Sequence, residues 1–427
     1  MANWLRNSSW LKLVLLFATC VVITSLFHSG KKINGVIWSD QEGYYIYLPA
    51  VFIYGGFEDV PCVNGCTTVE RNGSKYTFTK YTYGISLMEA PFFAIAHLIS
   101  KPLGYAGDGR SLPYIWAVML AAICYMLAGL VLLHRLLKEL EFELVSVMVP
   151  VGLLLGTNLF YYTFREAGMS HVYSFFLFTV LIYASHKRTI SKKLIWTFLT
   201  AFPLALVVLI RPTNAIAGLI PLLWAADFRD IPTRLKAFLT DWKWLLIFGV
   251  SLLVLFAPQV YYWRHLTGEY FLYSYGNEGF TNWNQPKVLQ VLLSHQNGWI
   301  TYSPIVLIGL AGLWQMIRRR ITGWQMPTVT LVLATYIFAS WWAWWFGGAY
   351  GHRCYVDFLP LLAVPSAFAV KAIIESKMIY KAALLGFALI TSFVNIRMSD
   401  LYHGMWDGPG WTWHNYIDKL LEAFYIF

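Results

Sequence analysis

Two carboxylates in one short polar segment are the first side chains whose position suggests chemistry. Asp40 and Glu42 lie in residues 38–49, shortly after a long apolar stretch. A carboxylate held at a membrane boundary can accept the proton of an attacking hydroxyl or amine while a phosphate leaves. The alternative interpretation is that Asp40 only caps the helix that follows it. The segment is our first candidate for a general base.

A second polar segment, residues 165–171, places three functional groups within one short turn. These groups are Arg165, Glu166 and His171. If the turn is functional, Glu166 is a second acid that orients an acceptor or a metal, and Arg165 or His171 contacts phosphate. The alternative is a surface ion pair between Arg165 and Glu166, with Ser170 capping the next helix.

A third segment, residues 347–360, combines glycines with an arginine. Glycine lets the backbone approach a ligand closely, and the planar fork of Arg353 matches phosphate oxygens. The alternative is an ion pair between Arg353 and Asp357, which are four residues apart on a helix. Because a salt bridge does not require the glycines, we favour phosphate contact by His352 and Arg353. Asp357 is then expected to contact the substrate.

Two further cations and two tyrosines complete the set of candidate site residues. Arg211 follows the apolar run 204–210, so its guanidinium must either reach the interface or bind an anion. Lys80 precedes an apolar segment, where it could meet a lipid phosphate. Tyr81 and Tyr44 are candidates for contact with the phosphate or with a sugar.

Composition determines the environment in which these residues act. The 427 residues are 58% apolar and 13% charged, with a mean hydropathy of +0.53, whereas soluble domains are roughly 25% charged. We expect an all-α polytopic membrane protein with about eleven transmembrane helices. The alternation typical of an outer-membrane barrel is lacking. The expected spans are 10–28, 113–133, 142–162, 171–186, 194–211, 213–226, 244–263, 298–317, 325–346, 356–373 and 381–398.

The distribution of positive charge predicts how these spans cross the membrane. More than half of the 32 Lys and Arg residues fall in six short connections, and such an excess is typical of cytoplasmic loops. The N-terminus is therefore expected inside and the C-terminus outside. The candidate site residues then lie on the periplasmic side of a bacterial inner membrane, and no nucleic acid partner is expected. The six connections are 1–12, 134–141, 187–193, 227–243, 318–320 and 371–381.

The longest connection, residues 29–112, is expected to be a structured periplasmic loop. Its apolar segments 44–54 and 85–100 are interpreted as helices lying at the membrane interface, because a crossing by 85–100 would invert the charge pattern downstream. The polar stretch between them contains Cys62 and Cys66. An oxidising compartment would permit a disulfide there.

The chain shows no sign of a second domain or of a nucleotide site. We treat 1–427 as one transmembrane domain, ending in a short periplasmic tail, 399–427, that is too short for its own core. A Walker loop, a dinucleotide fingerprint, a zinc-protease helix and a lipase elbow are all lacking. A periplasmic enzyme without nucleotides needs an activated donor already in the membrane, and a polyprenyl-phosphate-linked sugar meets this requirement.

The segment 39–45, the interfacial first loop and the turn 351–353 before a late span resemble the C-type glycosyltransferase superfamily. Within it, the chain is similar to bacterial family 39-like proteins, relatives of protein O-mannosyltransferases and of the lipid A aminoarabinose transferase. The resemblance covers about residues 10–400. It implies the GT-C fold and an inverting transfer of a sugar from a polyprenyl-phosphate donor at the periplasmic face.

The resemblance also assigns roles to individual residues. The acidic residue of the family's first outer loop matches Asp40, which is then the general base. Family members often have adjacent Asp and Glu, whereas Gln41 intervenes here, so Glu42 is kept as a reserve base. Glu166 resembles a second-loop acidic position. A divalent metal between the carboxylates is left open, because a monophosphate donor does not demand one.

Two other functions remain compatible with the sequence. A transporter or flippase of lipid-linked glycans would use Arg211, Arg353 and Glu166 to bind an anionic substrate, but we find no internal repeat. An O-antigen-ligase-type transferase would take a lipid-diphosphate donor and depend on His352 and Arg353. The sequence does not name the sugar or the acceptor, which is a lipid, a glycan or a protein.

Overall fold

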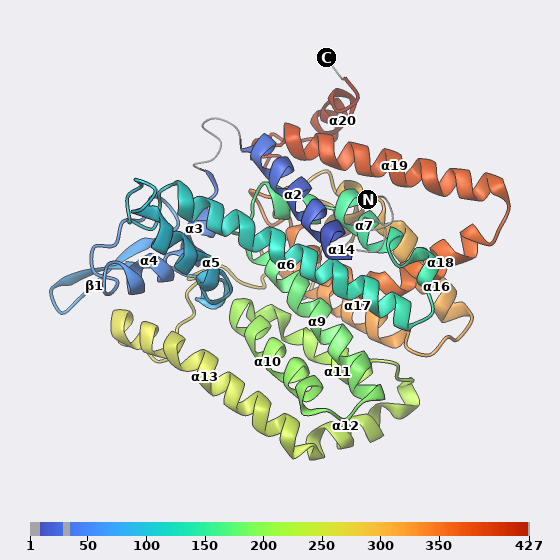
Figure 1. The fold of residues 1–427 in the computed structure, drawn as a ribbon, viewed down its shortest axis with the longest axis horizontal. Helices are drawn as coiled ribbons and strands as arrows, with labels where there is room; N and C mark the ends of the chain where they lie inside the picture. The colour runs from blue at the N-terminus through green and yellow to red at the C-terminus, as the bar shows by residue number, and fades with distance from the viewer. Residues whose placement is uncertain (1–8, 29–34, 426–427) are drawn as a thin grey trace. The chain divides into compact units, whose positions relative to one another are not determined.

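The computed structural model describes residues 9–28 and 35–425. Its regular secondary structure is helical, apart from one two-stranded antiparallel sheet (Figure 1). The chain forms two compact units. Unit 1 contains the residues up to Ala128 together with Tyr162–Tyr173 and Tyr262–Tyr270, and unit 2 contains Gly129–Tyr161, Ser174–Tyr261 and the residues from Phe271 on.

Unit 1 contains the expected periplasmic loop and the first helices. Its elements are α2 (Ser9–Phe27), α3 (Ser39–Tyr45), α4 (Tyr47–Phe52), β1 (Thr67–Arg71), β2 (Ser74–Phe78) and α5 (Gly84–Ser100). The helices α6 (Leu112–Glu139), α8 (Leu159–Phe164), α9 (Ser170–Ile190) and α13 (Trp242–Thr267) contribute residues to both units. The expected interfacial segments are thus helical, as α3 with α4 and as α5.

The polar part of this loop folds into a hairpin that the sequence analysis did not anticipate. β1 pairs with β2 in register, from Thr67 opposite Phe78 to Arg71 opposite Ser74. Asn72 and Gly73 connect the strands with φ angles of 52° and 86°. Two positive φ angles are typical of the tight turn that Asn-Gly favours.

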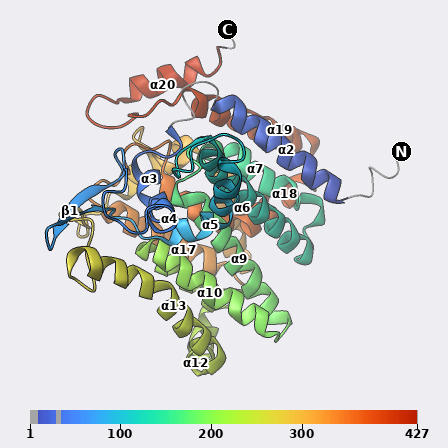
Figure 2. The same ribbon diagram turned by 60° about the vertical axis from the view of Figure 1, so that its left-hand side comes forward.

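Unit 2 contains the later helices. Its elements are η2 (Glu143–Val145), α7 (Met148–Gly156), α10 (Leu194–Ile210), η3 (Pro212–Gly218), α11 (Leu219–Leu223), η4 (Phe228–Asp230), α12 (Ile231–Thr240), α14 (Val288–Leu293), α15 (Trp299–Tyr302), α16 (Val306–Arg318), α17 (Gln325–Ser340), η5 (Arg353–Leu362), α18 (Ala363–Ile374), α19 (Met378–Leu401) and α20 (Trp413–Glu422), where η marks a 3₁₀ helix. α20 folds back toward α19 (Figure 2). Arg397 on α19 donates to the carbonyls of Ala423 and Tyr425, just after the end of α20.

Close helix packing in unit 2 depends on a small residue. A Cβ at Gly312 on α16 would lie 1.8 Å from the carbonyl oxygen of Pro365 on α18. Small residues allow such backbone contact between apolar helices, where van der Waals packing rather than water drives association. Gly312 therefore sets the distance between α16 and α18.

A helix lies at each of the predicted spans. In the described part of the chain, the helices long and apolar enough to cross a membrane are Leu112–Glu139, Trp242–Thr267, Arg353–Ile374 and Met378–Leu401. The other predicted spans coincide with α9 and with shorter apolar helices. The all-α polytopic membrane fold is confirmed.

Two predicted spans are interrupted. The span 142–162 is divided at Thr157 into α7 and α8, and the span 298–317 is divided between α15 and α16. The carbonyls of Leu155 and Thr157 accept hydrogen bonds from the Asn395 side chain at 2.9 and 2.8 Å. Non-helical backbone is tolerated at membrane depth where such a partner satisfies it.

Candidate active site

Asp40 lies in the first turn of α3, a helix of only seven residues. The cap residue of this helix, Trp38, makes no side-chain cap hydrogen bond. Helices this short are marginal without tertiary contacts. Asp40 is partly exposed, and its carboxylate complements the helix dipole. Because Trp38 occupies the cap position, Asp40 is not the cap of α3.

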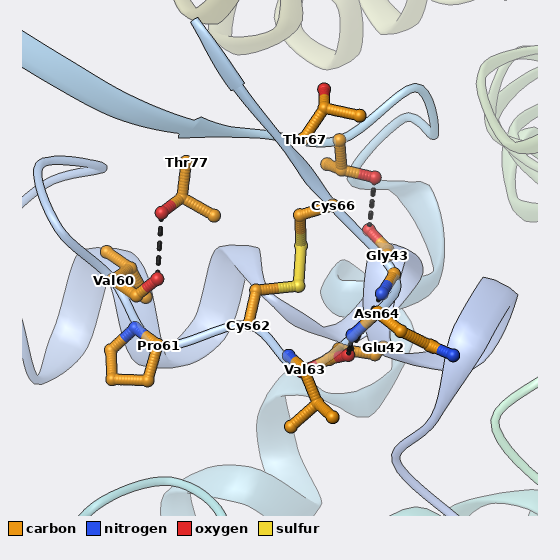
Figure 3. The surroundings of a disulfide bond; sticks show 12 residues. Glu42, Gly43, Val60, Pro61, Cys62, Val63, Asn64, Cys66, Thr67 and Thr77 are labelled. Atoms are coloured by element: carbon orange, nitrogen blue, oxygen red, sulfur yellow. Dashed lines mark hydrogen bonds between the residues drawn. A yellow bond between two sulfur atoms is a disulfide. The ribbon is translucent and has the colours of Figure 1, made fainter.

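Glu42, the reserve carboxylate, is buried against a loop of the same unit (Figure 3). Its Oε1 accepts the backbone N–H of Val63 at 2.8 Å, and its Oε2 accepts those of Asn64 and Gly65 at 2.9 and 3.0 Å. The Arg110 guanidinium also donates to Oε1. Both oxygens are thus occupied by donors from the protein, which suits Glu42 to a structural role.

Gln41, between the two carboxylates, joins α3 to the turn that carries the second predicted cluster. Its Oε1 accepts the backbone N–H of Gly168 at 3.1 Å, across 127 residues of sequence. A Cβ at Gly168 would lie 3.0 Å from the Gln41 side chain, so the glycine permits this approach. The structure therefore brings the Asp40 segment beside residues 165–171.

The three groups of that turn differ in accessibility. Arg165 and Glu166 are partly exposed, whereas His171 is buried. The His171 ring packs edge-on against Tyr162 with the centroids 5.1 Å apart, and the Arg165 guanidinium lies 5.1 Å from the centroid of the Phe27 ring. Arg165 and Glu166 are thus better placed than His171 to meet a substrate.

Lys80, Tyr81 and Tyr44 also lie together in unit 1. The two tyrosine rings are buried with their centroids 4.3 Å apart. The Lys80 ammonium is 5.6 Å from the centroid of the Tyr81 ring, and its side chain is partly exposed. The tyrosines are therefore packing residues of unit 1, and Lys80 supplies a partly exposed positive charge beside them.

In unit 2, Arg211 and Asp357 belong to one buried polar cluster. Asp357 is fully buried, and its Oδ2 accepts the Asn214 side-chain N–H at 2.8 Å. Arg211 Nη1 lies 3.7 Å from the same oxygen, and Arg211 Nη2 donates to Cys354 Sγ at 3.0 Å. Arg211 thus has a buried anion of its own chain beside it.

His352 and Arg353 lie at the start of the 3₁₀ helix η5. His352 is buried, with Nε2 at 3.1 Å from the carbonyl oxygen of Trp344, while Arg353 is partly exposed. Of the two, Arg353 is the accessible cation. The predicted site residues of unit 2 are Arg211, His352, Arg353 and Asp357; those of unit 1 are Asp40, Glu42, Tyr44, Lys80, Tyr81, Arg165, Glu166 and His171.

A buried carboxyl on α5 is a further notable group that the sequence analysis missed. Glu89 is 1% exposed, and its Oε1 accepts the Tyr173 hydroxyl at 2.7 Å, while Oε2 has no hydrogen-bond partner among the described residues. Burial raises the pKa of Glu89 to about 8, and the hydrogen bond from Tyr173 opposes this increase. A lone carboxylate in an otherwise apolar helix was the signal that could have identified it.

We expect Glu89→Gln to remove a pH dependence of stability. The ordinary pKa of 4.5 means that the unfolded chain loses this proton well before the folded chain does. The folded state then binds more protons between about pH 4.5 and pH 8, so the stability of the wild type falls as pH rises through this window. Melting temperatures of both proteins in detergent should diverge from pH 5 to pH 8 in favour of the variant; parallel curves would contradict the assignment.

No group of three or more His, Cys, Asp or Glu side chains that could hold a metal ion occurs among the residues that the structure describes. Asp40 and Glu42 are carboxylates close together in the sequence, but the Glu42 oxygens already accept hydrogen bonds from backbone N–H groups of the protein.

Comparison with known proteins identifies the fold. No family model matches the sequence. No curated protein matches it either. Among solved structures, the crystal structure of ArnT from Cupriavidus metallidurans bound to undecaprenyl phosphate is similar, with a TM-score of 0.53 and 12% sequence identity, over 91% of this chain and 71% of ArnT. This chain therefore has the fold of the C-type glycosyltransferases.

Proposed function

We propose that this protein transfers a sugar from a polyprenyl-phosphate donor to an acceptor at the periplasmic face of the inner membrane. The observation that carries the proposal is Asp40, an accessible carboxylate on a helix anchored by its neighbours Gln41 and Glu42. The fold supports it, because ArnT, which shares that fold, was crystallised with undecaprenyl phosphate.

Asp40 is the general base in this proposal. Its carboxylate takes the proton of the acceptor hydroxyl or amine as the acceptor oxygen or nitrogen forms a bond to the anomeric carbon. The bond from that carbon to the phosphate oxygen breaks with its electron pair, and the polyprenyl phosphate leaves on the opposite side. Configuration at the anomeric carbon is inverted. Glu42 takes no part as a base, because its oxygens are engaged.

The negative charge on the departing phosphate requires fixed positive charge. In unit 1, Lys80 and Arg165 are partly exposed cations in the same compact unit as Asp40. In unit 2, Arg353 is partly exposed and His352 is buried. Cations fixed in advance stabilise developing charge without reorganisation. Lys80 and Arg165 are therefore the phosphate contacts that unit 1 offers, and Arg353 stays the phosphate contact predicted for unit 2.

The test is transfer from labelled polyprenyl-phosphate sugars to a membrane extract by purified protein. We expect wild type to label an acceptor and Arg353→Ala to lose about 10²-fold in rate. Arg353→Lys should recover part of the rate, because charge is kept while the planar fork is lost. Arg319→Ala, which removes an exposed arginine of the same unit, is the matched control.

Two outcomes would contradict parts of the proposal. Full activity of Arg353→Ala would show that Arg353 does not bind the phosphate, but it would not contradict sugar transfer. If folded wild type consumes no donor but moves the intact lipid-linked sugar across the bilayer, the protein is a transporter and the proposed sugar transfer is wrong.

A further inference from the structure

The loop that binds Glu42 is closed by a disulfide. Cys62 and Cys66 are bonded, and the three residues between them are the ones whose backbone N–H groups meet the Glu42 carboxylate (Figure 3). Successive backbone N–H groups that converge in this way form an anion-binding concavity. Here the bound anion is a side chain of the protein, two residues after Asp40.

The same loop holds the residue before Asp40. The Asn64 side chain accepts the backbone N–H of Ser39 at 2.8 Å. A Cβ at Gly65 would lie 2.3 Å from the Ser39 carbonyl oxygen and 2.6 Å from the Gly43 nitrogen, so only glycine lets the loop lie directly on α3. Asp40 is therefore bracketed by contacts to one five-residue loop.

These contacts stabilise α3, which is too short to be stable as an isolated helix. Hydrogen bonds to a charged group are stronger than those between neutral groups, and Arg110 compensates the buried negative charge of Glu42. The disulfide keeps the three N–H donors converged by restricting the short loop. The seven-residue helix has no side-chain cap of its own, and Gln41 adds a second tertiary contact, to Gly168. Glu42 and the loop therefore hold the backbone on both sides of Asp40.

We infer that Glu42, Arg110 and the Cys62–Cys66 loop are positioning elements for the base Asp40. This inference rests on the proposed function. Glu42 acts through α3 and touches no substrate, and the protein reaches its active geometry only where the disulfide can form. A shift of about 1 Å in a reacting group can cost 10²-fold in rate, so loss of the loop contacts affects turnover more than donor binding.

The first test compares Glu42→Gln with wild type in detergent. The amide keeps the size of the side chain but places an N–H₂ group where one oxygen accepts backbone N–H donors. We expect kcat to fall about 10²-fold, with the KM for the donor little changed. Glu70→Gln is the matched control, because Glu70 is an exposed carboxylate on the neighbouring hairpin.

The second test removes the disulfide. Dithiothreitol supplies two electrons and two protons, giving thiols at Cys62 and Cys66 and the cyclic disulfide of the reagent. We expect wild type to lose kcat on reduction and to regain it on reoxidation. The double variant Cys62→Ser/Cys66→Ser should be slow from the start and insensitive to the reagent. The free cysteines of the described chain, Cys20, Cys124 and Cys354, are thiols already.

Hydrogen exchange of the α3 amides is the readout that does not need activity. Reduction or Glu42→Gln should increase exchange over Ser39–Tyr45 and leave α6 unchanged. If wild type transfers sugar and both perturbations lower only the melting temperature, with kcat per folded enzyme and α3 exchange unchanged, the inference is overturned and the proposed function stands. If wild type transfers nothing, the proposed function fails. Unchanged α3 exchange would then overturn the inference as well, whereas increased exchange would support the anchoring of α3.

Discussion

Asp40→Asn should reduce sugar transfer by about 10²–10⁴-fold, the range typical of losing a general base. The amide is isosteric with the carboxylate and cannot accept the acceptor proton. Folding should be retained, because Asp40 is partly exposed and the contacts of Gln41 and Glu42 remain. The measurement is kcat and KM for the donor, with the melting temperature recorded alongside.

Glu42→Gln provides an informative comparison, because it removes the neighbouring carboxylate. If Asp40 is the base, Asp40→Asn abolishes the acidic limb of the pH–rate profile, because the carboxylate whose ionisation the reaction requires is gone. Glu42→Gln lowers kcat but retains that limb. The reverse pattern would make Glu42 the base and would refute the assignment to Asp40.

Arg211→Ala should destabilise the protein by about 3 kcal/mol, the low end of the range for breaking a buried ion pair. The reason is Asp357, which is fully buried and would lose the nearby guanidinium. The hydrogen bond from Asn214 to the Asp357 carboxylate would remain. Thermal unfolding in detergent measures the loss, and the exposed Arg319→Ala serves as the matched control, with an expected change within about 0.5 kcal/mol.

A double variant separates this structural role from the predicted role in phosphate binding. In Arg211→Ala/Asp357→Asn the buried charge is removed together with its partner, so much of the stability should return. Unchanged stability of Arg211→Ala together with a raised KM for the donor would show instead that Arg211 binds the donor phosphate.

Hydropathy was sufficient to predict where the long apolar helices lie, because the requirement for apolar length is local in sequence, but it did not predict α12, α14 or α20. The end of α10 at Ile210 was likewise predictable, since Arg211-Pro212 interrupts the helical pattern. The interruptions between α7 and α8 and between α15 and α16 were not. At the first of them, backbone carbonyls accept hydrogen bonds from Asn395, which is distant in sequence, and hydropathy cannot identify such partners.

The sequence indicated which residue types could do chemistry, but not which contacts each of them makes. Asp40 and Glu42 look equivalent in the sequence. What separates them is a loop 21 to 23 residues further along the chain and Arg110, 68 residues away. Cys62 and Cys66 indicated that the loop could close, but nothing local to them pointed to Glu42. Similarly, the spacing of Arg353 and Asp357 suggested a helical pair, but nothing local to it indicated that Arg211 lies beside Asp357.

The most direct test of the central claim is the identity of the lipid product. Wild type and Asp40→Asn, each in proteoliposomes, would be incubated with a polyprenyl-phosphate sugar and a membrane extract, and the lipids analysed by mass spectrometry. We predict free polyprenyl monophosphate in equal amount to the sugar transferred by wild type, and intact donor with Asp40→Asn. Equal release by both proteins would contradict the role of Asp40, and unreacted donor with folded wild type would contradict glycosyl transfer itself.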